Sequence, residues 1–204
     1  AMCATVAYSD DHGETWQLGR SPNEGRQTPE GELDPQTFVD ETWSLHEAAV
    51  VERHDGVLVL FMRNQHPRGR VAVSESHDAG QTWGPIRFDE ALPEIWCQPN
   101  AISLPSPEGE DRIVFANASQ MLPFRGCGVM RLSHDDGATW PHNRVINPRH
   151  YVYQCMCVLP DGMIGILWEN ECQGLHFSRL PLSWFSDGLE TVDPRQAESQ
   201  DVRS

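Results

Sequence analysis

Apolar residues fall in short runs separated by turn-forming residues, a pattern that predicts an all-β chain. The clearest case is a hairpin in which residues 47–52 and 57–64 flank the turn Arg53-His54-Asp55-Gly56. Asp-Gly turns close β-hairpins, and nearly continuous apolar runs on either side are typical of inner strands covered on both faces. Residues 153–159 and 163–170 repeat this design around Asp161-Gly162.

An octapeptide of the form Ser-x-Asp-x-Gly-x-Thr-Trp occurs three times, at residues 9–16, 76–83 and 133–140. In each copy the Ser and Asp side chains can bond turn amides, Gly can take a positive φ, and Thr-Trp can restart a strand. Each copy therefore predicts a tight turn with Trp as an apolar anchor. The recurrence indicates that one supersecondary unit is used repeatedly.

The hairpins and octapeptides combine into units of four antiparallel strands, an inner hairpin followed by an outer pair. A third inner hairpin at residues 97–104 and 112–117, around a Pro-Ser-Pro-Glu-Gly-Glu turn, fits this scheme. Such units repeated around an axis are the blades of a β-propeller, and about three and a half of them are expected here. They are an outer half-blade at residues 1–18 and blades at residues 45–90, 91–145 and 146–185.

Three stretches depart from the repeat. Residues 19–44 are polar and rich in Pro and Gly, which predicts a long exposed connection. The last unit has no octapeptide, and its outer strands are expected in the apolar runs at residues 175–177 and 182–185. Residues 186–204 are polar and are predicted to form a C-terminal tail.

Composition narrows the possible partners. The chain of 204 residues is long enough for one domain with a substantial core. Its formal net charge of −15 argues against a nucleic-acid partner, which would need a basic face, and no apolar run reaches the ~20 residues of a membrane span. The six cysteines lack zinc-ligand spacing, so no metal is predicted.

Two of these cysteines, Cys155 and Cys157, lie two positions apart in a predicted strand. They should share one face of the sheet, and we expect them to be buried free thiols. Since cysteine pairing is what reports the redox compartment, both a secreted and a cytoplasmic location remain open.

Strand polarity sorts the polar residues onto two faces of the predicted propeller. The Asp-Gly turns and all three octapeptides fall on one face, with His12, His77 and His134 expected in solvent. The opposite face receives a set of ionisable residues that converge at one mouth, which suggests a site. That set is Glu47, Arg63, Arg125, Tyr153 and Glu169.

Each member of this set has a simpler interpretation as well. Glu47 could be only a strand-end carboxylate paired with Arg63, which should lie opposite it. Tyr153 could be a core or rim aromatic, and Tyr151 faces the same way in a strand. Arg125, in the predicted return loop at residues 118–126, could be a surface residue.

The octapeptide resembles the Asp-box of sialidases and of several other β-propeller families, and the wider constellation resembles the exo-sialidase family. The resemblance extends from the first Asp-box to about Phe185. The motifs that carry it are Leu45-His46-Glu47-Ala48 with Arg63-Asn64, Phe124-Arg125-Gly126-Cys127-Gly128, and Tyr153-Gln154-Cys155.

This resemblance implies a six-bladed propeller that releases terminal sialic acid from sialylated glycans with retention of configuration and without cofactor. Tyr153 would be the nucleophile, Glu47 would take up its proton, and Arg63 and Arg125 would be two of three arginines that bind the substrate carboxylate. A tyrosine suits this chemistry because an anionic nucleophile would be repelled by that carboxylate. Guanidinium groups suit it because they bind carboxylates bidentately. Sialyl transfer and release of an anhydro product would use the same core residues.

Two features depart from the family pattern. Gln154 follows the nucleophile position, where the family usually has Ser. The family's first arginine and its acid/base aspartate precede the first Asp-box seen here, and Asp10 and Asp11 are Asp-box residues on the other face. We therefore expect the C-terminal portion of a sialidase propeller, its opening blades supplied by a separate chain or segment. The alternative is a non-catalytic Asp-box propeller that serves as a glycan- or protein-binding scaffold.

Overall fold

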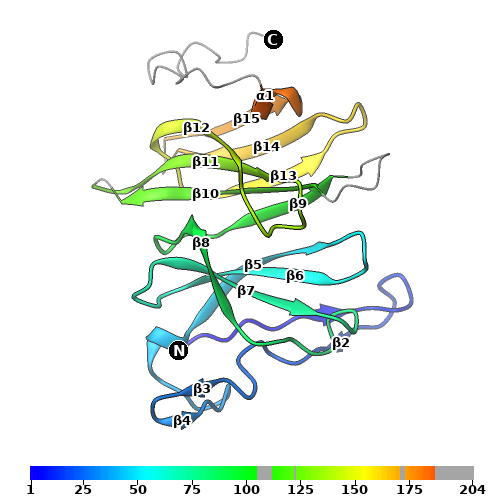
Figure 1. The fold of residues 1–204 in the computed structure, drawn as a ribbon, viewed down its shortest axis with the longest axis vertical. Coiled ribbons are helices and arrows are strands. Elements are labelled where there is room, and N and C mark those ends of the chain that lie inside the picture. The colour runs from blue at the N-terminus through cyan, green and yellow to red at the C-terminus, as the bar shows by residue number, and fades with distance from the viewer. Residues whose placement is uncertain (105–111, 122, 171–172, 187–204) are drawn as a thin grey trace.

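The computed structural model describes residues 1–104, 112–121, 123–170 and 173–186, and antiparallel sheets dominate it (Figure 1). The first four-stranded sheet consists of β5 (Leu45–Glu52), β6 (Leu58–Asn64), β7 (Arg70–Ser76) and β8 (Arg87–Pro93). The second consists of β9 (Asn100–Leu104), β10 (Arg112–Met121), β11 (Arg125–Ser133) and β12 (His142–His150). In both sheets strands adjacent in sequence are adjacent in space, which is the order of a propeller blade.

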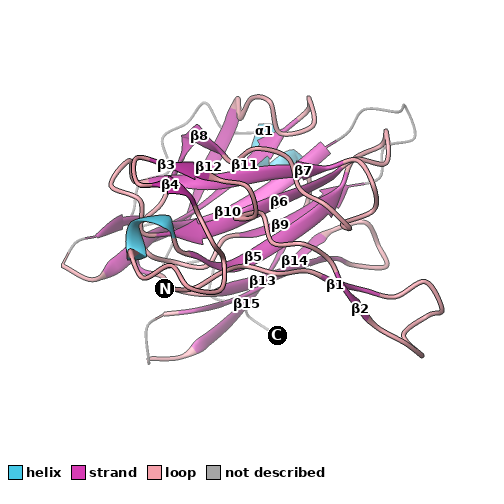
Figure 2. Cartoon of the chain, turned by 90° about the horizontal axis from the view of Figure 1, so that it is seen from below, coloured by secondary structure: helices cyan, strands magenta, loops and turns pink. Residues whose placement is uncertain are grey.

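Smaller sheets flank these two. A three-stranded sheet follows them, formed by β13 (Gln154–Val158), β14 (Ile164–Glu169) and β15 (Leu175–Leu180). The strands β1 (Ala7–Tyr8) and β2 (Gln17–Leu18) pair near the N-terminus. Figure 2 shows that strands and loops make up almost all of the molecule, with helix confined to short cyan segments. The predicted all-β architecture is confirmed.

Aromatic side chains pack between the first two sheets. Phe61 from β6 and Phe115 from β10 lie with ring centroids 5.4 Å apart, and both rings contact Trp140 of the third Asp-box. All three side chains are buried. The Trp140 indole also donates a hydrogen bond of 3.0 Å to Asp89 on β8, so one aromatic cluster joins two blades.

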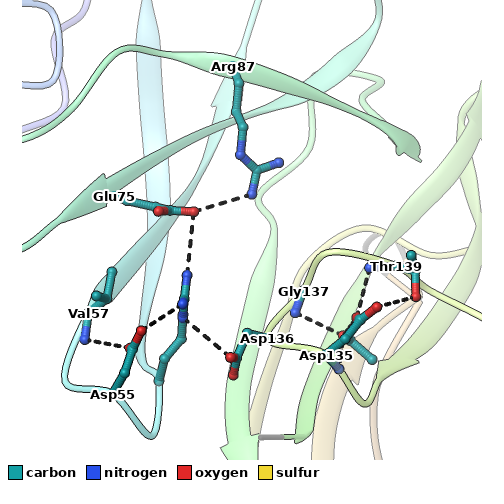
Figure 3. Close-up of polar contacts among 10 residues, drawn as sticks. Asp55, Val57, Glu75, Arg87, Asp135, Asp136, Gly137 and Thr139 are labelled. Atoms are coloured by element: carbon teal, nitrogen blue, oxygen red, sulfur yellow. Dashed lines mark hydrogen bonds and ion pairs between the residues drawn. The ribbon is translucent and has the colours of Figure 1, made fainter.

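The three Asp-boxes are tight turns with one shared hydrogen-bonding pattern. In the third copy, Ser133 Oγ donates to Asp135 at 2.7 Å, and Asp135 accepts from the Thr139 amide at 2.8 Å and from its hydroxyl at 2.6 Å (Figure 3). Gly137 has φ +80°, a conformation that glycine adopts without a steric penalty. The copies at residues 9–16 and 76–83 repeat these bonds.

The connection at residues 19–44 is more ordered than its polar composition suggested. It contains the strand pair β3 (Gln27–Thr28) and β4 (Gly31–Glu32) and the 3-10 turn η1 (Glu41–Trp43). Asn23 is fully buried and its amide donates to the Trp43 carbonyl at 3.0 Å. Polar side-chain bonds to the backbone therefore order this segment where apolar content is low.

The end of the last unit differs from the sequence prediction. Residues 182–185 were expected to form a strand but lie in a helical turn, α1 (Ser183–Ser186). Pro181 precedes the turn and its carbonyl accepts from the Trp184 amide at 2.9 Å, as suits a residue that favours helix starts. The predicted turn at residues 105–110 and the predicted tail beyond Ser186 lie outside the described residues.

Cys155 and Cys157 share one face of β13 as predicted, but they are exposed and not buried. The same face carries three large apolar side chains that are also exposed, Leu167, Leu175 and Phe177. No other sheet of the described residues covers this face, whereas Met156, Ile164 and Ile166 on the opposite face are buried. The prediction assumed burial on both faces, and only one face has a partner here.

No helix within the described ranges combines the length and the apolar character needed to cross a membrane.

Candidate active site

Glu47 and Arg63 form an ion pair at the open end of the first hairpin. Arg63 Nη1 donates to both carboxylate oxygens of Glu47, at 3.1 Å and 3.2 Å. The pairing changes register between Leu45↔Asn64 and Ala48↔Met62, so His46 and Glu47 together oppose Arg63. Such a β-bulge redirects a side chain relative to the regular alternation of the strand. The prediction that the two residues lie opposite each other is confirmed.

The Glu47 side chain is 46% exposed, whereas that of Arg63 is 17% exposed. The carboxylate is thus accessible at the surface, while the guanidinium is held within the blade. Burial, followed by the nearby Arg63 charge, lowers the pKa of His46 beside this pair. A neutral imidazole is therefore expected next to the ion pair at neutral pH.

Tyr153 and Arg125 form a second pair. Arg125 Nη1 donates to the Tyr153 hydroxyl at 3.1 Å, and the guanidinium carbon lies 5.0 Å from the centre of the tyrosine ring. Arg125 was expected in a return loop but begins strand β11, where it pairs with Met121 at the end of β10. Extension of the β10–β11 hairpin thus places Arg125 on ordered backbone.

Tyr153 and Tyr151 have different environments in the structure. Tyr151 is fully buried, stacks on Trp168 with ring centroids 5.5 Å apart, and burial raises the pKa of its hydroxyl well above the usual value. Its ring packs so closely on Gly128 that a Cβ there would lie 2.3 Å from it. Tyr151 is therefore a core residue, whereas the half-buried Tyr153 directs its hydroxyl to an arginine.

The two pairs come from sheets that contact one another, since β9 packs against both β5 and β13. Tyr153 Oη is hydrogen-bonded to Arg125, and the Glu47 carboxylate is hydrogen-bonded to Arg63. Among the residues that the structure describes, no hydrogen bond joins Tyr153 to Glu47. The Glu169 backbone amide donates a hydrogen bond of 3.0 Å to the Tyr153 carbonyl.

Gln154, which follows Tyr153, anchors β13 to the neighbouring blade. Its side chain is buried, and its amide nitrogen donates to the carbonyls of Gln98 at 2.9 Å and Ala116 at 3.2 Å. The longer side chain therefore has a packing role that a serine could not fill.

Two residues at this face escaped the sequence analysis, Glu94 and Trp96. Glu94 is buried and accepts hydrogen bonds from the main chain, and the carbonyl of the exposed Trp96 lies 3.4 Å from Arg125 Nη1. The sequence feature that could have identified them is Glu94 itself, an acidic residue directly after the strand that ends at Pro93 and directly before the apolar triplet Ile95-Trp96-Cys97.

A metal site does not emerge from the parts of the chain that the structure describes. Within them, no three or more His, Cys, Asp or Glu side chains gather in a way that could hold an ion. The candidate site thus consists of two arginine-anchored pairs, one centred on a carboxylate and one on a phenol.

Comparison with known proteins agrees with the fold and the motifs. The profile of the BNR repeat-like domain matches residues 2–166. A sialidase of Micromonospora viridifaciens is 32% identical over 189 residues, which cover 90% of this chain and 26% of that protein. A sialidase of Bacteroides fragilis is 27% identical over 225 residues, which cover 87% of this chain and 41% of that protein.

Among solved structures, the Hadza microbial sialidase Hz136 superposes with a TM-score of 0.63 at 25% identity, over 90% of this chain and 33% of that one. The chain thus spans between about a quarter and two fifths of the length of these relatives. Together with the stacked sheets and the three Asp-boxes, these matches show that the chain belongs to the BNR repeat-like domain family and forms part of a sialidase-type β-propeller.

Proposed function

We propose that the protein containing this chain is a retaining exo-sialidase that releases terminal sialic acid from sialylated glycans. The observation that carries the proposal is the placement of Tyr153 and Glu47, each against its own arginine, on neighbouring sheets. Similarity to two sialidases supports the general activity, and we assign the roles of the individual residues from the resemblance of their motifs to the exo-sialidase family and from their chemistry.

In the first step, the Tyr153 oxygen forms a bond to the anomeric carbon while the bond to the glycosidic oxygen breaks. The phenol proton passes to the Glu47 carboxylate, which makes tyrosine a competent nucleophile without a full charge at the outset. A neutral phenol is suited to a carbon that carries a carboxylate, because an anionic nucleophile would be repelled. In the second step a water molecule attacks the anomeric carbon and gives up a proton to the conjugate base of the acid that protonated the leaving group. The sialyl-tyrosine bond breaks, and Glu47 returns its proton to the departing phenolate.

Arg125 and Arg63 would bind the substrate carboxylate. Arg125 Nη1 now donates to Tyr153 and to the Trp96 carbonyl, while Arg63 Nη1 donates to Glu47. A carboxylate entering between them would compete for these donors and would leave the phenol available to Glu47. The third arginine and the acid that protonates the leaving group are assigned to the blades that precede this segment in the family.

The test is Tyr153→Phe in the full-length protein, assayed with an aryl α-sialoside. Loss of the nucleophilic oxygen should lower kcat by about 10³-fold or more with little change in KM, because binding does not require the hydroxyl. Proton NMR of the wild-type reaction should show the α-anomer of sialic acid first. The matched control is Tyr8→Phe, which removes a surface hydroxyl bonded to Gln17 at 3.2 Å and should leave kcat unchanged. Wild-type kcat in Tyr153→Phe would rule out the nucleophile assignment.

The scaffold alternative is favoured by one observation, the exposed apolar face of β13–β15. Patches of this kind mark surfaces that bind another protein element. In the sialidase proposal a further blade, within a separate chain or segment, covers this face. In the scaffold proposal the protein binds sialylated glycans and shows no turnover of the aryl α-sialoside, so the same assay separates the two.

A further inference from the structure

Glu94 is a buried carboxylate at the end of strand β8, and each of its oxygens holds a different segment of backbone. The residue is only 7% exposed. Oε2 accepts from the Asn64 amide at 2.7 Å, and Oε1 accepts from the Cys97 amide at 3.0 Å. A buried carboxylate is costly unless it is hydrogen-bonded, so these contacts are what make its position tenable.

The first of these contacts fixes the strand end that carries Arg63. Asn64 directly follows Arg63 in β6 and is itself buried. Its side-chain amide donates to the Arg70 carbonyl at 2.9 Å, and its side-chain oxygen accepts from the His66 amide at 3.0 Å. Glu94 accepts the hydrogen bond of the Asn64 backbone amide, so Asn64 at the end of β6 is bonded to Glu94, Arg70 and His66.

The second contact fixes a turn that reaches Arg125. Trp96, one residue before Cys97, has φ +63°, a conformation rarely adopted by a bulky residue and retained only where surrounding contacts enforce it. The turn directs the Trp96 carbonyl to Arg125 Nη1 at 3.4 Å. The Cys97 thiol donates to the carbonyl of Val152 at 2.7 Å, next to Tyr153.

Glu94 therefore connects the backbone behind Arg63 with the turn that contacts Arg125. We propose that Glu94 is a positioning residue that sets the spacing and orientation of Arg63 and Arg125 for the substrate carboxylate. This inference rests on the proposed function, in which the two arginines bind that carboxylate.

A carboxylate is required at Glu94 because each of its two oxygens must accept a hydrogen bond from a backbone amide. Glutamine has the same shape, but only one of its two terminal atoms is an acceptor, and the other is a donor. In Glu94→Gln, a donor would therefore face either the Asn64 amide or the Cys97 amide, and that contact would be lost. The variant thus uncouples one of the two segments with almost no change in volume.

The experiment uses the full-length protein and compares N-acetylneuraminic acid with its methyl ester as ligands, by calorimetry or saturation-transfer NMR. The ester keeps the sugar and loses the negative charge that the arginines recognise. Glu94→Gln should weaken binding of the acid by about 10- to 100-fold, because small displacements of binding groups cost that much, and should change binding of the ester by less than about twofold. For the aryl α-sialoside, KM should rise more than kcat falls.

The matched control is Glu90→Gln, on strand β8, which Glu94 directly follows. Glu90 is exposed and pairs with Arg68 and Arg70 on the outer part of the blade. This variant should bind both ligands like the wild type. Glu94→Asp retains two acceptor oxygens on a shorter side chain and should bind the acid more tightly than Glu94→Gln does, which tests the acceptor argument if Glu94→Gln folds poorly.

Equal weakening of acid and ester in Glu94→Gln would show a general packing defect and overturn the positioning role, as would wild-type affinity for the acid. Weaker binding of the acid by Glu94→Asp than by Glu94→Gln would also overturn it. A wild-type protein that neither cleaves the sialoside nor prefers the acid over the ester would instead refute the proposed function itself.

Discussion

The two faces of this partial propeller differ in how their polar residues are bonded. On the Asp-box face, Asp135 bonds Ser133 and Thr139, which lie within one octapeptide. On the other face, Arg125 bonds Tyr153 and Trp96, residues from different segments of the chain. The first arrangement is closed within its own turn, whereas the second forms only when separate blades come together. Local closure serves stability, and convergence from distant segments produces a site.

The Asp-box face also contains ion pairs between blades. Arg53, from the β5–β6 turn, forms ion pairs with three carboxylates. Its guanidinium nitrogens lie 2.7 Å from a carboxylate oxygen of Asp55, 3.7 Å from one of Glu75 and 3.6 Å from one of Asp136 in the next blade's Asp-box. Figure 3 shows Glu75 on strand β7 and Asp136 in the Asp-box turn after β11 approaching the same region, with Arg87 above Glu75. The contrast between the faces can therefore be tested by measuring activity and stability separately.

The largest effect is expected on activity from Arg125→Ala. Removal of the guanidinium should lower kcat/KM for an aryl α-sialoside by about 10²- to 10³-fold, as loss of one preorganised donor does at other active sites. The melting temperature should change by only a few degrees, since Arg125 is half-buried and bonds the half-buried Tyr153 and the carbonyl of the exposed Trp96. An unchanged kcat/KM would remove Arg125 from the carboxylate clamp.

The next effect concerns stability. Trp140→Ala should lower the free energy of unfolding by about 3–5 kcal/mol, because it empties the aromatic cluster between blades and removes the bond to Asp89. Trp16 occupies the same octapeptide position in the first copy but is 65% exposed, so Trp16→Ala should cost less than about 0.5 kcal/mol. Denaturant titration measures both, and similar losses in the two variants would contradict the packing argument.

A smaller effect depends on pH. Hydrogen bonds from Thr15 and Ser9 lower the pKa of Asp11 to about 2, and those from Thr82 and Ser76 lower that of Asp78 to about 2. Because the folded-state pKa lies below the ordinary value of 3.8, each carboxylate stabilises the fold above that value, and the stabilisation is lost as the pH falls toward 2.

Carboxyl carbon NMR should show both aspartates titrating near pH 2, well below an aspartate in an unfolded peptide. Asp78→Asn should make stability less sensitive to acid over this range. An ordinary pKa for Asp78 would show that the turn bonds do not favour the charged form.

The smallest effect is expected from Arg53→Ala. Its ion pairs lie near the surface, with Asp55 47% and Glu75 34% exposed, and pairs in such positions contribute about 0–1 kcal/mol. Thermal unfolding in low and high salt measures this contribution, which should diminish with salt. A loss above about 2 kcal/mol would indicate a stronger coupling between the blades than surface ion pairs provide.

Much of the fold could be predicted because its signals are local. The Asp-Gly turns and the octapeptides fixed where strands reverse, and the equal distance of Glu47 and Arg63 from the Asp55-Gly56 turn predicted that they lie opposite each other. Other features depended on neighbours that no local pattern reveals. Cys155 and Cys157 alternate as in a strand, but whether their face is buried depends on a covering sheet. Residues 182–185 are apolar enough for a strand, yet Pro181 and packing of α1 against β12 favour a helical turn.

The sequence by itself determined the repeating unit, the hairpins and the face on which Glu47, Arg63, Arg125 and Tyr153 lie, because each follows from turn chemistry and the two-residue period of a strand. Only the tertiary structure decided that Tyr151 is core while Tyr153 meets Arg125, and that Glu94 joins the backbone of Arg63 to the turn beside Arg125. These outcomes depend on contacts between residues far apart in the chain, whose distances are set by how blades pack and not by the residues themselves.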